Sequence, residues 1–406
     1  MAMDRALLSV PRTSSFTFTQ ARAHQISVFS GQNKAFLQWI SSSSRKISDE
    51  AAGRRQSIIS WRRLQAAIDP TNPTPTSSSE TIIDTPFFRI YGDRRIDRLV
   101  GTATVPPGLD VATGVTSRDV VIDAATGLYV RLYLPPPTGD EQQQKKKRKL
   151  PVLVYFHGGA FVTQSAAAPA YQPFLSTLAA RAGLLAVSVN YRLAPEHPLP
   201  AAYEDSFMAL RWVAAAGDPW LSEHGDLSRL FVAGESAGGN IAHNVAVMAA
   251  GDGALRIEGA ALLHAGFSGR EPVDGEPPEW VETMEKLWAV VCPEAADGVD
   301  DPRMNPLAPA AKAASLRNMM LACERVLVCA AEKDLGTARC RAYYEALAAA
   351  ADADDNSSSS GRKKKKVVVE WFESKGKDHV FFLAEPDCVD AVALMDRLVA
   401  FFAAGS

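Results

Sequence analysis

The chain has 406 residues, of which 47% are hydrophobic and 22% charged, and its formal net charge is -3. This composition excludes an intrinsically disordered protein, and a chain without a basic excess gives no reason to expect a nucleic-acid partner. No stretch approaches the roughly 18 apolar residues that span a bilayer. The five cysteines are irregularly spaced, which is typical of free thiols in a reducing compartment. We expect a soluble protein with apolar material for one large core or two ordinary ones.

The first 78 residues differ from the rest of the chain in composition. Basic residues outnumber acidic ones by ten to four, serine and threonine are frequent, and three prolines at 70, 73 and 75 mark a linker. Such a leader resembles an organelle transit peptide, whereas its apolar stretch is too short for a secretory signal. We interpret residues 1–78 as a disordered leader, either a transit peptide, a plain tail or an over-extended gene model. The protein is then cytoplasmic, plastid or mitochondrial, not secreted, and its folded domain spans 79–406.

The predicted elements of the folded part alternate between strand and helix. A hairpin is expected first, over 120–123 and 128–134. Short apolar runs then predict strands buried on both faces, at 151–156, 184–190, 230–233, 259–264, 325–330 and 367–372. Helical patterns lie between them, at 171–182, 201–216, 237–250, 337–350 and 389–402. Polar tracts at 139–149 and 351–366 are interpreted as surface loops. The order predicts one α/β domain with a mostly parallel central sheet flanked by helices, and ligands bind at the carboxyl ends of such strands.

The strongest chemical signal is the run Gly234-Glu235-Ser236-Ala237-Gly238, which directly follows a predicted strand and precedes a predicted helix. Gly234 and Gly238 allow a sharp strand-to-helix turn that exposes the Ser236 hydroxyl. The sequence therefore predicts that Ser236 is a nucleophile. The alternative is a glycine-rich helix start that Ser236 caps.

A second glycine-rich run could stabilise the oxyanion that attack by a serine creates. His157-Gly158-Gly159-Ala160-Phe161, here called the glycine loop, follows the strand at 151–156. Its backbone amides, with the amide of Ala237 at a helix N-terminus, could donate hydrogen bonds to that oxyanion. The alternative is an ordinary turn. We interpret His157 as a residue that orients the loop and not as the base.

His379 is the best candidate for the base, because it follows the last predicted strand in a loop beyond the sheet edge. His243 and His264 are interpreted as packed residues. Asp334 lies just past the strand at 325–330 and is expected to orient His379. The fallback acids are Asp378 and Glu332, and a solvated carboxylate is the alternative for Asp334. The chain order Ser, Asp, His is the one expected for this arrangement.

These residues resemble the plant carboxylesterases of the hormone-sensitive-lipase type, within the α/β-hydrolases. The resemblance rests on the glycine loop and on four further motifs, at 191–197 (YRLAPEH), 234–240 (GESAGGN), 301–306 (DPRMNP) and 376–379 (GKDH). It implies the α/β-hydrolase fold and a triad of Ser236, Asp334 and His379. It also implies oxyanion donors, which map onto the amides of Gly159, Ala160 and Ala237.

The resemblance further implies a small helical cap over the active site, which we place near 85–108 and 270–302. Trp280 and Trp288 in the second segment are candidates for contact with a ligand. Two departures from the family pattern stand out. Ala160 replaces a frequent third glycine, and it can serve as a donor if its backbone is not left-handed. His264-Ala265 replaces a His-Pro pair.

The resemblance implies a serine carboxylesterase that hydrolyses small or medium esters through an acyl-enzyme, without a metal or an organic cofactor. One alternative is a lyase or acyl-transfer enzyme, like relatives that dehydrate hydroxyisoflavanones or convert glucose esters into lactones. Another is a non-catalytic hormone receptor like the gibberellin receptors, which replace the base histidine; the presence of His379 disfavours it. The natural substrate and the oligomeric state remain open.

Overall fold

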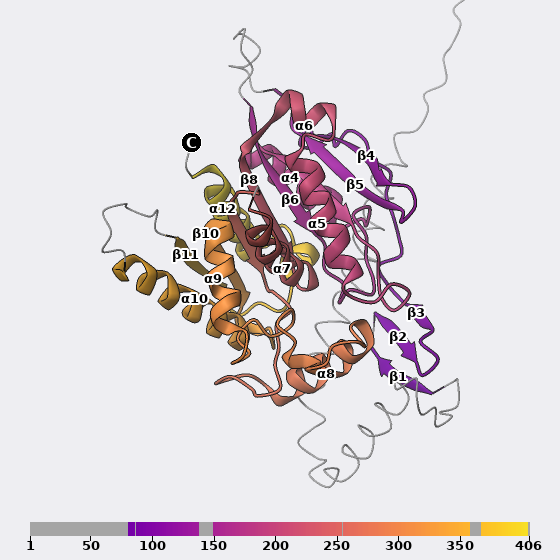
Figure 1. The fold of residues 1–406 in the computed structure, drawn as a ribbon. Helices are drawn as coiled ribbons and strands as arrows, with labels where there is room; N and C mark the ends of the chain where they lie inside the picture. The colour runs from indigo at the N-terminus through magenta and orange to yellow at the C-terminus, as the bar shows by residue number, and fades with distance from the viewer. Residues whose placement is uncertain (1–79, 86, 138–148, 254, 358–366, 405–406) are drawn as a thin grey trace, which may run out of the picture.

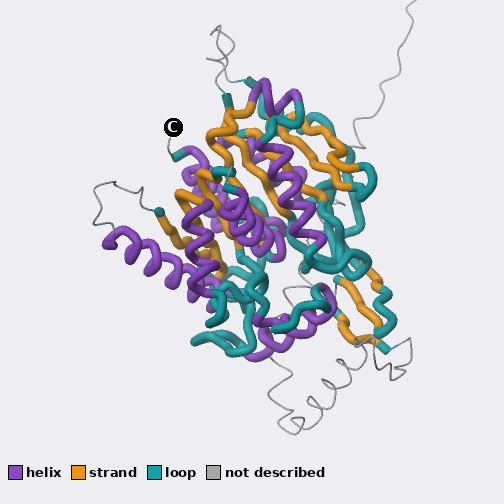
Figure 2. The backbone as a smooth tube through the Cα atoms, in the orientation of Figure 1, coloured by secondary structure: helices purple, strands orange, loops and turns teal. Residues whose placement is uncertain are grey.

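The structure is a computed structural model that describes residues 80–85, 87–137, 149–253, 255–357 and 367–404. The predicted leader, residues 1–78, lies outside these residues. Figures 1 and 2 show a large sheet with helices packed around it and a small sheet, β1 to β3, at one end near helix α8. None of the helices in the described ranges is long and apolar enough to cross a membrane.

An eight-stranded sheet forms the centre of the molecule. Its strands are β4 (Thr116–Asp123), β5 (Leu128–Leu134), β6 (Leu150–Phe156), β7 (Leu185–Asn190), β8 (Gly225–Glu235), β9 (Ile257–Leu263), β10 (Cys323–Ala331) and β11 (Val368–Ser374). Their order in the sheet is β11-β10-β9-β8-β6-β7-β5-β4. The strands from β6 to β11 pair in parallel, and β5 is antiparallel to both β7 and β4. This confirms the predicted N-terminal hairpin and the mostly parallel sheet.

Strand β6 illustrates why the apolar runs form buried strands. Val152, Val154 and Phe156 belong to the core on one face of the sheet, and Leu153 and Tyr155 belong to the core on the other. Successive side chains of a strand point to opposite faces, so a strand covered on both sides must be apolar at every position.

Helices cover both faces of this sheet (Figure 1). One core cluster takes side chains from α5 (Ala201–Ala214), α7 (Ala237–Asp252), α9 (Lys312–Ala322) and α10 (Thr337–Ser357). The other takes side chains from α4 (Tyr171–Ala182), α11 (Phe381–Ala384) and α12 (Val389–Ala403). The described helices also include two short elements, α6 (Pro219–His224) and η2 (Gly298–Asp300). Helix α10 runs on to Ser357, where a loop was expected from 351, because alanine favours continuation of the helix.

The two segments expected to form a cap contain one long helix and part of a small sheet. Helix α8 (Pro278–Val291) lies within the expected segment 270–302. The other expected segment, 85–108, does not contribute a helix. It holds β2 (Phe88–Tyr91) and β3 (Ile96–Arg98), which form an antiparallel sheet with β1 (Thr81–Asp84). The reason is a period of two, since Phe88 and Ile90 are buried while Arg89 between them is exposed.

Arg98 joins this small sheet to the main domain. Its Nε donates to the Val162 carbonyl at 2.6 Å, and its two terminal nitrogens contact the Glu196 carboxylate at 2.8 and 2.7 Å. The Thr163 hydroxyl also donates to the carbonyl of Val100 at 2.6 Å. The cap sheet is therefore held directly beside the glycine loop.

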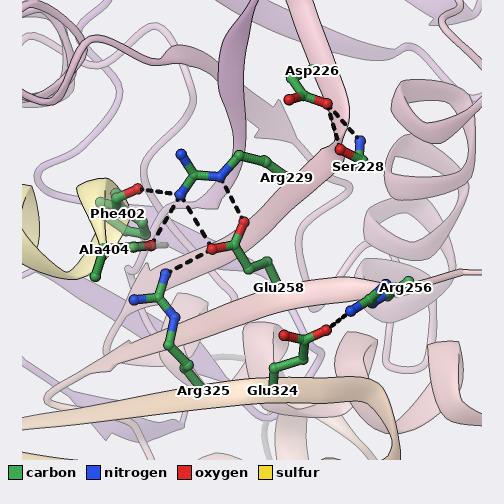
Figure 3. A network of polar contacts seen from close by, with 9 residues as sticks. All are labelled: Asp226, Ser228, Arg229, Arg256, Glu258, Glu324, Arg325, Phe402 and Ala404. Atoms are coloured by element: carbon green, nitrogen blue, oxygen red, sulfur yellow. Dashed lines mark hydrogen bonds and ion pairs between the residues drawn. The ribbon is translucent and has the colours of Figure 1, made fainter. Parts of the chain in front are cut away.

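An arginine–glutamate network lies towards the amino ends of strands β8, β9 and β10. Arg229 of β8 and Arg325 of β10 both point towards Glu258 of β9, the strand between them (Figure 3). Arg229 also donates to the carbonyl oxygens of Phe402 and Ala404, at the end of α12. The last helix is thus fastened to the edge of the sheet opposite the strand ends that are expected to carry the chemistry.

Candidate active site

Ser236 lies at the sharp turn between β8 and α7. Its backbone has φ 55° and ψ -120°, a conformation that residues other than glycine rarely adopt. A Cβ atom on Gly238 would stand 2.0 Å from the Phe156 carbonyl oxygen, and one on Gly234 would stand 2.3 Å from the oxygen of Gly238. Only glycine therefore allows the strand and the helix to approach so closely around the serine.

His379 and Asp334 are brought together from the ends of neighbouring strands, although 45 residues separate them. His379 Nδ1 lies 2.7 Å from Asp334 Oδ2, and both side chains are buried. The backbone amide of Gly336 donates to Asp334 Oδ1 at 3.0 Å, which fixes the carboxylate from its other side. Since Nδ1 faces the carboxylate, it carries the proton, and the lone pair of the neutral ring lies on Nε2.

The pKa values of this pair move in the directions that an ion pair requires. Burial lowers the pKa of His379, but the charge and the hydrogen bond of Asp334 outweigh it, so this pKa is raised above its usual value. Burial raises the pKa of Asp334, yet the contact with His379 and the weaker effect of His264 hold it below its usual value. A base of this kind gains a proton readily and keeps its carboxylate partner ionised.

A cavity of about 390 Å³ connects these residues. Its lining includes Ser236 and His379, and it also includes Gly159, Ala160 and Ala237, the three predicted oxyanion donors. Most of the remaining wall is apolar, from β1, the glycine loop, α8 and the end of α11. Ser236, His379 and the amide-bearing residues Gly159, Ala160 and Ala237 therefore line one space that could hold a small molecule.

The glycine loop turns in the left-handed region of backbone space. Gly159 has φ 109° and Ala160 has φ 55°, so the alanine does not meet the condition set for it from the sequence. The loop closes on itself because the amides of Val162 and Thr163 both donate to the carbonyl of Gly159, at 3.0 Å each. Within the described ranges, the amides of Gly159 and Ala160 have no hydrogen-bond acceptor. They are thus available to a ligand, at the expense of a strained alanine.

The side chain of His157, the first residue of the glycine loop, is buried and does not line the cavity. Its ring stacks on Tyr191 with centroids 4.2 Å apart, and the Tyr191 hydroxyl donates to the His157 carbonyl at 2.7 Å. Burial lowers the pKa of His157 to about 4, so the ring is neutral. A buried, stacked and neutral ring fits the role of orienting the loop.

The other histidines and acids weighed from the sequence lie elsewhere. His243 is buried between the Tyr343 hydroxyl, 3.0 Å from Nδ1, and the Ser315 hydroxyl, 3.2 Å from Nε2. Glu332 is exposed and accepts a hydrogen bond from the amide of Gly376 at 2.7 Å. Asp378 is partly buried, and its pKa is raised by that burial. Among the three candidate acids, Asp334 is the one whose carboxylate lies 2.7 Å from His379 Nδ1.

His264 was interpreted as a packed residue, and it is buried, but it also lies against Asp334 and the residue that follows His379. Its Nδ1 accepts the amide proton of Val380, the residue after His379, at 2.9 Å, and lies 3.8 Å from Asp334 Oδ2. Burial lowers the pKa of His264 to about 4. Its place became visible only with the strand order, in which β9 lies between the strands of Ser236 and Asp334.

Glu235 is the second residue whose role the sequence did not reveal. It precedes Ser236, it is buried, and it also borders the cavity. Its carboxylate accepts hydrogen bonds from Tyr155, Tyr171 and the backbone of Gly158. A carboxylate directly after the apolar run 230–234 is a usable signal, but its partners are 64 to 80 residues away.

Asn240, at the end of the GESAGGN motif, bonds two loops to helix α7 just after the sharp turn at Ser236. Asn240 Nδ2 donates to the carbonyls of Gly266 and Arg303, at 3.0 and 2.9 Å, and its Oδ1 accepts from the Tyr203 hydroxyl at 2.8 Å. The motif at 301–306 is thereby packed against helix α7. Two of the sequence motifs are parts of one contact.

The two tryptophans of the cap differ in position. Trp280 lines the cavity, and its Nε1 donates to the carbonyl of Phe267 at 3.2 Å. Trp288 is fully buried and packs edge-on against Phe161. Trp280 is therefore the one placed to contact a ligand.

One group of side chains in the described part of the chain has the spacing of a metal site. It consists of His264, Asp334 and His379, whose nearest ligand atoms lie within 4.8 Å of one another. However, His264 Nδ1 already accepts the amide of Val380, and the other two residues bond to each other. The same atoms are thus engaged in a hydrogen-bonded arrangement.

Comparison with known proteins gives matches over most of the chain. Residues 153–383 match the family model described as alpha/beta hydrolase fold. The chain is 41% identical over 355 residues to tuliposide A-converting enzyme b2, amyloplastic, of Tulipa gesneriana, covering 85% of this chain and 87% of the relative. It is 40% identical over 319 residues to probable carboxylesterase 2 of Arabidopsis thaliana (78% and 94%) and 37% identical over 331 residues to 2-hydroxyisoflavanone dehydratase of Glycyrrhiza echinata (78% and 94%).

Solved structures agree on the fold. A thermostable esterase from Pseudomonas putida matches with a TM-score of 0.56 at 24% identity, over 73% of this chain and 85% of that one. Together with the mostly parallel sheet and the family match, these relatives confirm the resemblance that the motifs indicated. The chain belongs to the alpha/beta hydrolase fold family, among its carboxylesterase-like members.

Proposed function

We propose that the protein is a serine carboxylesterase in which Ser236, His379 and Asp334 form the catalytic triad. The observation that carries this proposal is the 2.7 Å contact between His379 Nδ1 and Asp334 Oδ2, at a cavity shared with Ser236. The relatives named as carboxylesterase and esterase support the reaction class. The apolar wall of a cavity of about 390 Å³ suits a small or medium ester.

The proposed mechanism moves one proton in each of two steps. His379 Nε2 takes the proton of the Ser236 hydroxyl as its oxygen attacks the ester carbonyl, and the ring then gives that proton to the leaving alcohol. A water molecule, activated by the same ring, hydrolyses the acyl-enzyme to the free acid. Asp334 keeps the proton on Nδ1 and stabilises the charged ring.

The oxyanion of each tetrahedral intermediate would accept hydrogen bonds from the amides of Gly159, Ala160 and Ala237. Such donors act in a site that is already arranged for them, and loss of one typically reduces kcat about 100-fold to 1,000-fold. The assignment is supported by the free amides of Gly159 and Ala160, which line the cavity and have no hydrogen-bond acceptor among the described residues.

The test compares Ser236→Ala with Ser268→Ala in the full chain, on short p-nitrophenyl esters. Ser268 is a matched control because it is buried and its hydroxyl has no partner among the described residues. We expect Ser236→Ala to lose more than about 10⁴-fold in kcat and to resist labelling by a fluorophosphonate. The control should keep both properties. Unchanged turnover in Ser236→Ala would refute the nucleophile.

A second candidate function is a lyase or an intramolecular acyl transfer on a specialised metabolite. It is favoured by the relatives, since two of them are named a tuliposide A-converting enzyme and a 2-hydroxyisoflavanone dehydratase at 41% and 37% identity. The same triad could serve either outcome. Mass spectrometry of the products separates them: free acid and alcohol support hydrolysis, whereas loss of water or an internal ester supports the alternative.

We also propose that the protein acts in plastids. The Arg- and Ser-rich composition of residues 1–78 and the amyloplastic relative both support this location. Fusion of residues 1–78 to a fluorescent protein should direct it to plastids in leaf cells. A diffuse cytoplasmic signal, or a mitochondrial one, would contradict the proposal.

A further inference from the structure

A buried carboxylate lies directly under the glycine loop. Glu235 is the last residue of β8, and only 1% of it is exposed. Its Oε2 accepts the Tyr155 hydroxyl at 2.6 Å, and its Oε1 accepts the Tyr171 hydroxyl at 2.6 Å and the amide of Gly158 at 2.5 Å. The Gly158 amide also lies 3.2 Å from the Tyr171 oxygen. The group is thus fully engaged by donors from β6, α4 and the loop.

The contact at Gly158 is close enough to require glycine. A Cβ atom there would stand 2.6 Å from Glu235 Oε1 and 2.9 Å from the Glu235 carbonyl oxygen. Gly158 immediately precedes Gly159, whose amide is the first of the proposed oxyanion donors. The Gly158 amide belongs to the peptide plane of residues 157 and 158, and the Gly159 amide belongs to the next plane. The two planes meet at the Cα atom of Gly158, so holding the Gly158 amide fixes the position from which the Gly159 amide is directed.

The presence of a charge-bearing group here is not explained by packing. Burial raises the pKa of Glu235 to about 7, and the hydrogen bonds of Tyr155, Tyr171 and Gly158 offset part of that effect. Burial and the nearby carboxylate raise the pKa of both tyrosines, so both remain protonated donors. Burying an ionisable group costs stability that an apolar side chain would not. A residue kept at such a cost next to a nucleophile has a functional reason.

We propose that Glu235 is a positioning residue, which with Tyr155 and Tyr171 fixes the glycine loop at Gly158 and so aims the Gly159 amide at the reacting carbonyl. This inference rests on the proposed function for its effect on catalysis. It also makes a statement about the loop itself, which can be tested without turnover.

The kinetic test uses Glu235→Ala, Glu235→Gln and Tyr171→Phe in the full chain. The alanine variant should lose about 10-fold to 100-fold in kcat with KM within about threefold, because an oxyanion donor acts in the transition state and not in the bound ester. It should also bind a trifluoromethyl ketone, which forms a tetrahedral adduct with the serine, more weakly by a similar factor. Glu235→Gln keeps an acceptor for the Gly158 amide, so this variant should retain most of the wild-type kcat and most of the affinity for the ketone.

Tyr171→Phe separates position from charge, because it leaves the carboxylate in place and removes a donor. It should show the same pattern as Glu235→Ala, to about 10-fold in kcat. Glu258→Gln is the matched control for a polar network at the far end of the sheet and should leave kcat and ketone affinity unchanged. If Glu235→Ala folds and keeps the wild-type kcat, or changes only KM, the inference is wrong. If Glu235→Ala does not fold, the same result in Tyr171→Phe overturns the inference.

Hydrogen exchange gives a reading that does not depend on activity. Peptides covering 157–163 should exchange faster in Tyr171→Phe and Glu235→Ala than in the wild type or in Glu258→Gln. Unchanged exchange in these peptides would overturn the inference even if the enzyme is active. If instead the wild type hydrolyses no ester while exchange rises as expected, the proposed function fails and the role of Glu235 in the loop stands.

Discussion

Replacing Glu258 by glutamine removes the one carboxylate that two arginines share across three strands (Figure 3). Arg229 Nε and Nη2 lie 2.9 and 3.2 Å from the Glu258 oxygens, and Arg325 Nη2 lies 3.0 Å away. The three side chains are only 14%, 14% and 15% exposed. Glutamine preserves the shape but leaves two positive charges facing each other without the negative one.

The expected loss lies between two known limits. Exposed ion pairs contribute up to about 1 kcal/mol, and removing one partner of a fully buried pair costs about 3–5 kcal/mol. Arg229 keeps the carbonyls of Phe402 and Ala404 as acceptors, which softens the effect. We therefore expect Glu258→Gln to lower the free energy of unfolding by about 2 kcal/mol. With a urea dependence of about 3 kcal/mol/M, the midpoint falls by about 0.7 M.

Arg256→Gln is the matched control. Arg256 lies just before β9 and pairs with Glu324 of β10, but the Arg256 side chain is 74% exposed. Its replacement should change stability by less than about 0.5 kcal/mol. Urea unfolding followed by tryptophan fluorescence measures both variants, with esterase turnover recorded in parallel. Equal midpoints for the two variants, or a fall in kcat for Glu258→Gln below the transition, would refute the reasoning.

Two further predictions concern the active site. In Asp334→Asn, no carboxylate raises the pKa of His379, burial dominates, and that pKa falls. Because the neutral ring is the active form, the acidic limb of the kcat/KM profile should move to lower pH, and the plateau should drop about 10³-fold to 10⁴-fold. An acidic limb that moves to higher pH would contradict this prediction. In Ala160→Gly, glycine adopts the left-handed backbone without strain, so the variant should be equally stable or up to about 1 kcal/mol more stable in urea unfolding. Its kcat/KM should stay within about threefold of the wild type. A tenfold loss of kcat/KM would show that the methyl group of Ala160 is needed.

The elements that the sequence predicted well are those with a local cause. Ser236 stands between Gly234 and Gly238, which the sharp strand-to-helix turn requires. Apolar runs such as 151–156 form strands that are buried on both faces. The pairing of Asp334 with His379 followed from their places after neighbouring strand ends, combined with the family resemblance.

The features that were missed depend on contacts between distant segments. The bonds of Glu235 to Tyr155 and Tyr171 span 80 and 64 residues, so no local pattern announces them. The left-handed backbone of Ala160 follows from loop closure, which a residue type does not encode. The cap strands β1 to β3 hold only three or four residues each, too few for a period of two to stand out.

The cavity takes its walls from β1, from α8 and from the chain that follows His379, whereas Ser236 and Asp334 follow strands of the main sheet. Substitutions on the inner side of β1 or of α8 can therefore remodel the shape offered to an ester while the reacting atoms keep their places. A redesign of substrate choice can therefore begin in β1 and α8 without altering residues 236, 334 or 379.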